Sequence, residues 1–218
     1  MSGSAVAVDG ISLVSSTNHV AIPADPGRGL APNTVGPNAV IQTRLALADA
    51  CGDHDARRLF GYAELESWFD RPPDRMVEAE MVHRLNMALL AGLGGEAFDI
   101  VMTDAGRRTG HYILENRIPR AARIVLPWLP ARLASRILLR AIVANSWTFA
   151  GNATVCARGG SPATVEISGN PLPMPGCAWH RAVFETLFST LLGKAVRAEH
   201  CDTGPDTRHD IFSLRWNY

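Results

Sequence analysis

The spacing of apolar residues along this 218-residue chain changes at Gly151. Before this glycine, apolar side chains recur every three or four positions, which is typical of amphipathic helices. After it, apolar and polar side chains alternate over short segments bounded by glycines and prolines, which is typical of strands. Helices are predicted over about 37–50, 53–61, 74–91, 96–116, 130–147 and 177–192, and strands over about 153–158, 163–168, 194–201 and 210–216.

This order of elements predicts an α+β fold. The N-terminal two-thirds is helical and is followed by β-β-α-β-β. Because the strands come in pairs joined by short connections, a small antiparallel sheet packed with helices is expected. Residues 1–35 are rich in Gly, Ser, Pro and Ala and show neither period, so we expect a loose tail before a single domain over residues 36–218.

Composition and charge disfavour several classes of protein. The N-terminus lacks the basic and apolar regions of a signal peptide, and no uncharged apolar run is long enough to cross a bilayer. A cytoplasmic protein with at most peripheral membrane contact is therefore expected. The formal net charge is zero, which argues against a nucleic-acid partner.

The charged residues are segregated along the chain. Between residues 105 and 150 there are eight arginines and one acidic residue, Glu115, whereas acidic residues outnumber basic ones in the helical region before it. Arg132, Arg136 and Arg140 repeat every four residues, so they stand in a row on one helix face. A solvated face is the simplest interpretation, and porphyrin carboxylates or anionic lipid head groups are the alternative partners of this row.

Three C-terminal residues form a candidate metal site. Cys177 begins a predicted helix, Cys201 ends a strand and His209 begins the next strand. Two thiolates and an imidazole suit Zn²⁺. Because no C-x-x-C pair is present, buried free thiols beside a surface histidine are the alternative. The fourth ligand is left open between His180, Glu199 and His200.

The predicted helix over residues 96–116 carries further candidates. Gly106 and Gly110 lie about one turn apart and permit close approach of another backbone. His111 on this helix, or His83 on the preceding one, is a candidate ligand for the magnesium of a chlorin through a neutral ring nitrogen. An exposed histidine is the alternative at both positions.

No motif for a redox cofactor or a nucleophile is evident. The run Gly92-Leu93-Gly94-Gly95 follows a helix instead of a strand, so it does not fit a dinucleotide fingerprint. The four cysteines lack iron–sulfur spacing, and neither a P-loop nor a Gly-x-Ser-x-Gly elbow is present. No nicotinamide, flavin or iron–sulfur site is therefore predicted, and no catalytic residue is assigned.

Two segments resemble the bacteriochlorophyll 4-vinyl reductase family. They are Ala105–Pro119, with the sequence AGRRTGHYILENRIP, and Asn145–Gly151, with the sequence NSWTFAG. Residues 153–216 are also similar to the wider 4-vinyl-reductase domain, which serves as a ligand-sensing module in bacterial regulators. The resemblance spans about residues 37–218 and implies a small antiparallel sheet with helices around a ligand cavity.

The resemblance also implies a structural zinc site built from cysteines and a glutamate. Cys177 and Cys201 match two of the family's cysteines, and His209 stands where the family has its last one. Imidazole can replace thiolate on zinc. The position of the family's glutamate holds Ala198 here, and the neighbouring Glu199 would point to the opposite face of the strand.

The function implied by the resemblance lies in bacteriochlorophyll biosynthesis and photosynthesis. Because the sequence shows no reductant site, we expect a protein that binds a Mg-porphyrin or chlorophyllide-type tetrapyrrole and assists its processing or its delivery to other enzymes of the pathway. One alternative is an oxidoreductase that reduces the 8-vinyl group of a divinyl chlorophyllide-type substrate with an external reductant. Another is a small-molecule sensor or scaffold module.

The expected tetrapyrrole site lies between the sheet and the helices over residues 96–116 and 130–147. Aromatic rings would stack on the macrocycle, and arginines would pair with its propionates. Related folds often dimerise, so a homodimer is also expected. The candidate ligand-binding residues are Arg108, His111, Tyr112, Arg117, Arg136, Trp147 and Phe149.

Overall fold

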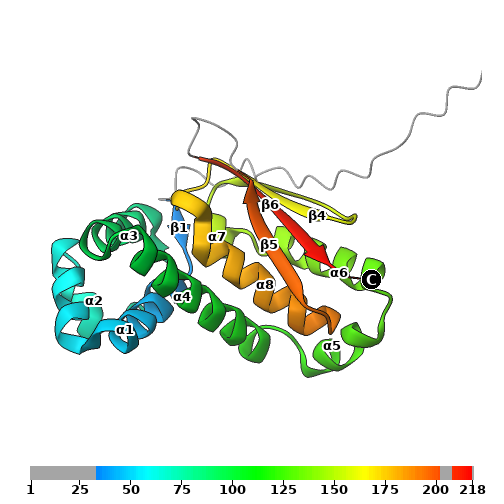
Figure 1. The fold of residues 1–218 in the computed structure, drawn as a ribbon, viewed down its shortest axis with the longest axis horizontal. Helices are drawn as coiled ribbons and strands as arrows, with labels where there is room; N and C mark the ends of the chain where they lie inside the picture. The colour runs from blue at the N-terminus through cyan, green and yellow to red at the C-terminus, as the bar shows by residue number, and fades with distance from the viewer. Residues whose placement is uncertain (1–32, 202–207, 218) are drawn as a thin grey trace, which may run out of the picture.

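The computed structural model describes residues 33–201 and 208–217. Helices come first and a four-stranded sheet comes last, which confirms the predicted α+β class and the order β-β-α-β-β (Figure 1). Most of the predicted N-terminal tail, residues 1–32, lies outside the described residues. The helices before the sheet are α1 (Asn38–Tyr62), α2 (Glu66–Asp70), α3 (Ala79–Leu93), α4 (Gly95–Asn116), α5 (Arg120–Val125), the 3-10 helix η1 (Leu126–Trp128), α6 (Ala131–Ala144) and α7 (Trp147–Ala150).

The first helices contain one break that the sequence predicts correctly and one helix start that it predicts wrongly. α1 is interrupted at Gly52, whose φ of 81° lies in the left-handed region, and this confirms the predicted break between two helices. The prediction that the next long helix starts near Asp74 is wrong, because β1 (Thr34–Val35) pairs antiparallel with β2 (Val77–Glu78). That ladder holds Val77 in an extended conformation, so α3 begins only at Ala79.

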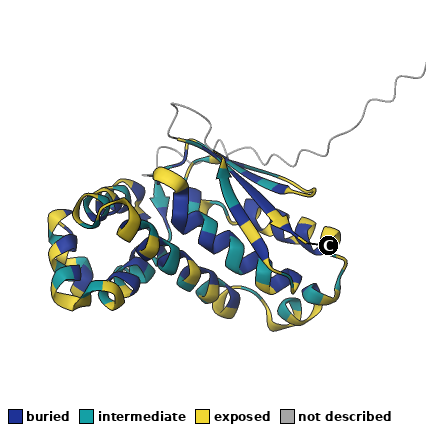
Figure 2. Ribbon diagram, in the orientation of Figure 1, coloured by how far each residue is buried: buried dark blue, intermediate teal, exposed yellow. Residues whose placement is uncertain are grey.

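The sheet has the strand order β3-β4-β6-β5, and all neighbouring strands are antiparallel. α8 packs on β5 and β6, whereas α6 packs on β3. Alternate side chains such as Val165, Ile167, Phe212 and Leu214 are buried beneath these helices (Figure 2). The strands are β3 (Thr154–Arg158), β4 (Ala163–Ser168), β5 (Val196–Cys201) and β6 (His209–Trp216), and η2 (Pro175–Cys177) and α8 (Ala178–Leu192) lie between β4 and β5.

α8 packs closely along α4 through two glycines. A Cβ atom at Gly106 would lie 2.4 Å from the carbonyl oxygen of Trp179, and one at Gly110 would lie 2.7 Å from the Cβ of Thr186. Both distances are far below van der Waals contact, so any larger side chain would push the helices apart. The predicted close approach at these glycines is therefore confirmed.

One face of α6 is open to solvent. Leu133 and Ile137 lie on this face and are exposed. The buried residues of α6 lie on its other side and are Ala134, Ser135, Leu138, Leu139, Ile142 and Val143.

Among the described residues, no helix has the length and apolar character needed to cross a membrane.

Candidate functional site

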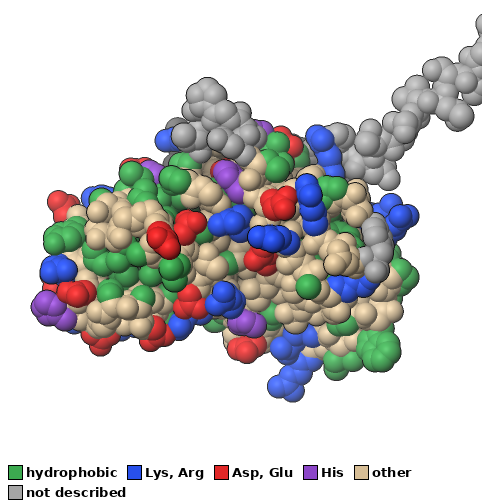
Figure 3. Space-filling model, in the orientation of Figure 1, with side chains coloured by type: hydrophobic (Ala, Val, Ile, Leu, Met, Phe, Trp, Pro, Cys, Tyr) green, Lys and Arg blue, Asp and Glu red, His purple; other side chains and the backbone are tan. Residues whose placement is uncertain are grey.

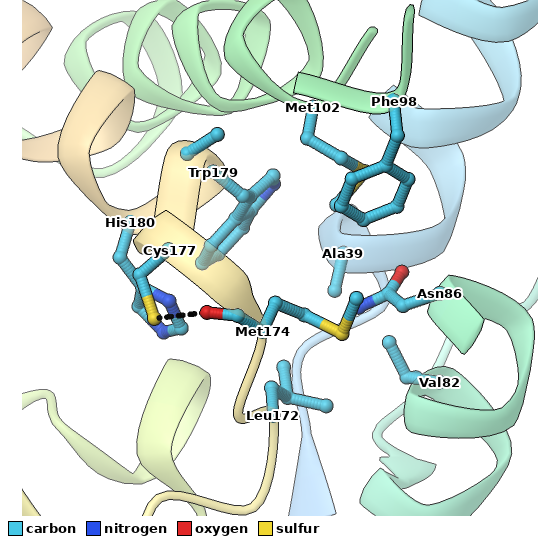
Figure 4. A pocket seen from close by; sticks show the side chains of 11 residues that line it. Ala39, Val82, Asn86, Phe98, Met102, Leu172, Met174, Cys177, Trp179 and His180 are labelled. Atoms are coloured by element: carbon cyan, nitrogen blue, oxygen red, sulfur yellow. Dashed lines mark hydrogen bonds between the residues drawn. The ribbon is translucent and has the colours of Figure 1, made fainter. Parts of the chain in front are cut away.

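A small cavity lies where α1, α3 and α4 meet the segment that leads into α8 (Figure 4). Its volume is about 20 Å³, which is room for about one water molecule. Most of its lining is apolar, and four separate parts of the chain contribute to it. The lining residues are Ala39 from α1, Val82 and Asn86 from α3, Phe98 and Met102 from α4, and Leu172, Met174, Cys177, Ala178, Trp179 and His180 from the segment entering α8.

Three residues of this lining each carry a buried polar atom without a hydrogen-bond partner. These atoms are Asn86 Oδ1, Trp179 Nε1 and His180 Nε2. Each of these residues is at most 8% exposed, so bulk water does not replace the missing partners. Leaving one buried polar group unpaired costs about 1–3 kcal/mol. The residues that line this apolar cavity thus carry an unpaired acceptor, an unpaired donor and an unpaired imidazole nitrogen, and a few such polar groups in an apolar lining are typical of a ligand site.

His180 is held in its neutral form. Burial lowers the pKa of its imidazole to about 4, although the charge of Asp210 and a hydrogen bond to the backbone of Phe149 act in the opposite direction. Aromatic rings surround it, with the centroids of Trp179 and Phe212 at 5.0 and 5.7 Å. A neutral imidazole whose Nε2 has no partner can accept a hydrogen bond or coordinate a metal ion.

Cys177 belongs both to the cavity and to a buried polar cluster with His200 and Asp210. Its Sγ lies 3.3 Å from Asp210 Oδ1, and His200 Nε2 lies 2.6 Å from the same oxygen. Asn170 Nδ2 donates a hydrogen bond of 2.6 Å to the other carboxylate oxygen. The ligand atoms of Cys177, His200 and Asp210 all lie within 4.8 Å of one another.

The ionisation of this cluster is unequal. Burial raises the pKa of the Cys177 thiol to about 12, and the carboxylate of Asp210 adds to this rise. Burial acts to raise the pKa of Asp210 as well, but hydrogen bonds from His200, Asn170 and Cys177 outweigh it and lower that pKa. At neutral pH the cluster therefore contains a buried carboxylate beside a protonated thiol.

The donor atoms of this cluster fit zinc. Thiolate, imidazole and carboxylate are all ligands of Zn²⁺, and binding would release the thiol proton of Cys177. His180, one of the candidates for the fourth ligand, is not among the side chains whose ligand atoms lie within 4.8 Å of one another, although the charges of Asp210 and His200 affect its pKa.

The structure does not bring the predicted ligands Cys201 and His209 to Cys177. They stand one residue from His200 and Asp210, and successive residues of a strand point to opposite faces of the sheet. Cys201 is exposed and His209 is half-buried. His200, one of the alternatives for the fourth ligand, takes the place that the sequence analysis gives to Cys201.

The remaining predicted zinc ligands have other partners. His209 Nδ1 lies 3.1 Å from Ser168 Oγ, and its Nε2 lies 3.6 Å from Glu166 Oε1. Glu199 pairs with Arg215 at 3.4 Å. These side chains occupy alternate positions of their strands, on the face of the sheet that α8 does not cover. They are Glu166 and Ser168 of β4, Glu199 of β5, and His209 and Arg215 of β6.

The predicted tetrapyrrole ligands are dispersed over the molecule. Phe149 contacts the cavity residue His180, with ring centroids 6.2 Å apart. Arg108 instead forms ion pairs with Asp104 and Asp49 at 2.7 and 2.6 Å, which connect α4 to α1. Of the others, which do not line the cavity, Tyr112 is half-buried and His111, Arg117, Arg136 and Trp147 are exposed.

Three residues of the site escape prediction from the sequence. Asp210 carries a signal, because it stands two residues before the inward-facing Phe212, so the alternation of β6 places a carboxylate on the buried face. Asn86 follows Val82 by one helical turn and shares its buried face. No local pattern marks the indole of Trp179.

His83, the alternative magnesium ligand, is half-buried, and its Nδ1 has no hydrogen-bond partner.

Comparison with solved structures defines the class of fold. An Fe(II) unliganded H-NOX protein from K. algicida matches 84% of this chain and 97% of its own, with a TM-score of 0.61 and 11% identity. An oxygen-binding H-NOX domain related to soluble guanylate cyclases matches 84% of this chain and 96% of its own, with a TM-score of 0.52 and 11% identity. The chain therefore has an H-NOX-like fold.

Comparison of sequences identifies the family. The bacteriochlorophyll synthase 23 kDa chain of Rhodobacter capsulatus is 36% identical over 170 residues, which are 76% of this chain and 78% of the relative. The chain of the same name from Cereibacter sphaeroides is 38% identical over 175 residues, 77% of this chain and 84% of the relative. No family model matches the chain. The protein belongs to the family of the bacteriochlorophyll synthase 23 kDa chain and has a role in bacteriochlorophyll biosynthesis, which confirms the predicted resemblance.

Proposed function

We propose that this protein binds a tetrapyrrole intermediate of bacteriochlorophyll biosynthesis and assists its processing or delivery. The observation that carries the proposal is the apolar cavity lined by Asn86, Trp179 and His180, each with a buried polar atom that lacks a partner. A porphyrin or chlorin offers a large apolar ring together with a few polar groups and a central metal. The chemistry of the cavity complements such a molecule.

The relatives and the fold support the same proposal. Both curated relatives are named for bacteriochlorophyll synthesis. The H-NOX proteins that share the fold include an Fe(II) unliganded protein and one in which the function of heme distortion was probed. A fold that is associated with heme in those proteins is suited to a tetrapyrrole in this chain.

The size of the cavity adds a conformational requirement to the proposal. A volume of about 20 Å³ holds about one water molecule and no macrocycle. The helices α1 and α3 must therefore move away from the segment entering α8 when pigment binds. Asn86 on α3 lies on one side of this opening, and Trp179 and His180 on α8 lie on the other (Figure 4). Their unpaired polar atoms have no hydrogen bonds to break when the opening widens.

The roles of the three residues follow from their chemistry. The N–H of Trp179 would donate to a carbonyl or carboxylate oxygen of the pigment. Asn86 Oδ1 would accept a hydrogen bond, or interact with a metal-bound water. The neutral Nε2 of His180 would ligate the central magnesium, because its low pKa keeps the lone pair available at neutral pH.

The test is anaerobic mixing of the purified protein with divinyl protochlorophyllide, with and without NADPH or dithionite, followed by absorbance and chromatography. A red-shifted bound spectrum with unchanged pigment is expected. Trp179→Phe should weaken binding about fivefold, the worth of one hydrogen bond. Trp216→Phe is the matched control, since the Nε1 of Trp216 is also buried without a partner but does not line the cavity.

Three outcomes would contradict this function. An absent spectral shift, or equal losses in both tryptophan variants, would show that the cavity does not bind the pigment. Conversion of the pigment to its monovinyl form, in proportion to protein and reductant, would instead establish the alternative function of an 8-vinyl reductase.

We also propose that Cys177, His200 and Asp210 bind zinc as a structural ion. Their donor types and mutual distances within 4.8 Å support this assignment. The metal content of the purified protein would be measured, and cobalt would be substituted for zinc to give a thiolate-to-metal absorption band. Cys177→Ser and Asp210→Asn should abolish the band, whereas Cys201→Ser should leave it. Loss of the band in Cys201→Ser alone would favour the ligand set predicted from the sequence.

A further inference from the structure

One corner of the molecule exposes large apolar side chains. Ile124 and Val125 of α5 are 66% and 52% exposed, and Trp128 in η1 is 86% exposed. Leu133 and Ile137 of α6 are exposed as well. Figure 3 shows hydrophobic side chains gathered at the lower right, over α5 and the turn that follows it. We name this set of five residues the α5–α6 apolar surface.

The exposed side chains stand on an anchored turn. Leu126, between Val125 and Trp128, is only 6% exposed and belongs to the hydrophobic core. Pro127 packs beside Gly193 at the end of α8, where an added Cβ would lie 3.3 Å from the proline Cβ. The core therefore fixes the turn and leaves the flanking apolar side chains directed to solvent.

The segment that carries this surface has charge of one sign. Residues 117–140 contain no Asp or Glu, and their six charged residues are all arginines. The helices α1–α3, at the opposite end of the molecule in Figure 1, carry the acidic residues that give their region a negative balance. The arginines are Arg117, Arg120, Arg123, Arg132, Arg136 and Arg140.

We infer that the α5–α6 apolar surface docks on a bilayer that contains anionic lipids. Tryptophan and branched aliphatic side chains partition into the interfacial region of a bilayer, and flanking arginines pair with lipid phosphates. Each basic residue near an anionic membrane contributes about 1 kcal/mol. The projecting, arginine-flanked turn fits a fluid anionic surface by charge complementarity. The helices α1–α3, with their negative balance, would be repelled by the anionic lipid and so face away from it.

The experiment is flotation of the purified protein with two kinds of vesicle, phosphatidylcholine alone and an equal mixture of phosphatidylcholine and phosphatidylglycerol. The protein should float only with the anionic vesicles and should be released by salt. The double variant Arg120→Gln/Arg123→Gln should bind about 30-fold more weakly. Trp128→Ala and Ile124→Ser should each lose about tenfold in binding.

Matched controls distinguish this surface from general stickiness. Ile100 is 64% exposed on α4, which closely matches Ile124, so Ile100→Ser should float like the parent protein. The double variant Arg71→Gln/Arg75→Gln removes the same charge from the acidic end of the molecule and should also float normally. Circular dichroism would establish that all variants are folded.

Three outcomes would overturn the inference. Docking of this surface on lipid is excluded if the parent protein stays unbound with both kinds of vesicle, or if the control variants lose as much binding as the surface variants. It is also excluded if light scattering shows a dimer that Trp128→Ala dissociates, because the surface would then be an interface between copies of this chain.

Discussion

α8 packs against two parts of the molecule in opposite ways. Along α4 it meets Gly106 and Gly110, and the two helices are so close that no larger side chain fits. At its beginning, near α3, it leaves a cavity in which buried polar atoms have no partners. Trp179 takes part in both, because its carbonyl oxygen faces Gly106 while its indole lines the cavity. The close contact holds the cavity residues in place, and the imperfect contact is the one suited to binding.

The largest expected effect is on the close contact. Gly106→Ala should destabilise the protein by about 3 kcal/mol, since the new Cβ would collide with the backbone of α8. The measurement is the free energy of unfolding in urea. Gly61→Ala in α1, where a Cβ meets nothing within 4 Å, should instead stabilise the protein by about 0.5–1 kcal/mol. Equal effects of the two changes would refute the role of Gly106 in packing.

The next effect concerns His180 and pH. A folded-state pKa of about 4, below the ordinary 6.5, means that the unfolded chain binds a proton first as the pH falls. Stability should therefore decrease by about 2 kcal/mol between about pH 7 and pH 4.5. The lowered pKa of Asp210 acts at still lower pH, where its contribution is lost as the carboxylate protonates.

His180→Phe should remove most of this loss, as measured by thermal unfolding in the presence of a chelator across the same pH range. His54, whose side chain is 92% exposed, provides the control, and His54→Gln should retain the full dependence. An unchanged pH dependence in His180→Phe would mean that another group is responsible.

A smaller effect tests whether the cavity sacrifices stability for binding. Asn86→Leu replaces an unpaired buried oxygen by an apolar group of similar shape and should raise the free energy of unfolding by about 1 kcal/mol. The same variant should bind pigment more weakly. A variant that is both less stable and fully competent to bind would contradict the assignment of Asn86 to the site.

The smallest effect is expected for Arg108. Its ion pairs with Asp104 and Asp49 are partly exposed, so Arg108→Gln should cost less than about 1 kcal/mol and only at low salt. Its pigment affinity should match that of Arg107→Gln, a neighbouring control on the same helix. A selective loss of pigment binding in Arg108→Gln would support the ligand role that was predicted from the sequence.

The family motif over residues 105–119 illustrates how sequence and structure divide the explanation. Gly106 and Gly110 serve helix packing, and Arg108 connects α4 to α1, so this part of the motif maintains the fold. The cavity instead uses Met102, one turn before Gly106, together with residues far along the chain. A segment that identifies the family is thus different from the segment that forms the candidate site.

The kind and order of the main elements follow from the sequence alone, because helices and strands arise from periodicities of neighbouring residues. The break at Gly52 and the close approach at Gly106 and Gly110 follow from it as well, because only glycine tolerates those positions.

Which side chains meet depends on the tertiary structure. The cavity joins Asn86 of α3 to Trp179 of α8, and the polar cluster joins Cys177 to His200 and Asp210. A shift of one residue along a strand reverses the face on which a side chain lies, so Cys201 and His209 could be chosen from the sequence while their neighbours form the site. Such pairings depend on the register of strands and the packing of distant helices, which no local pattern encodes.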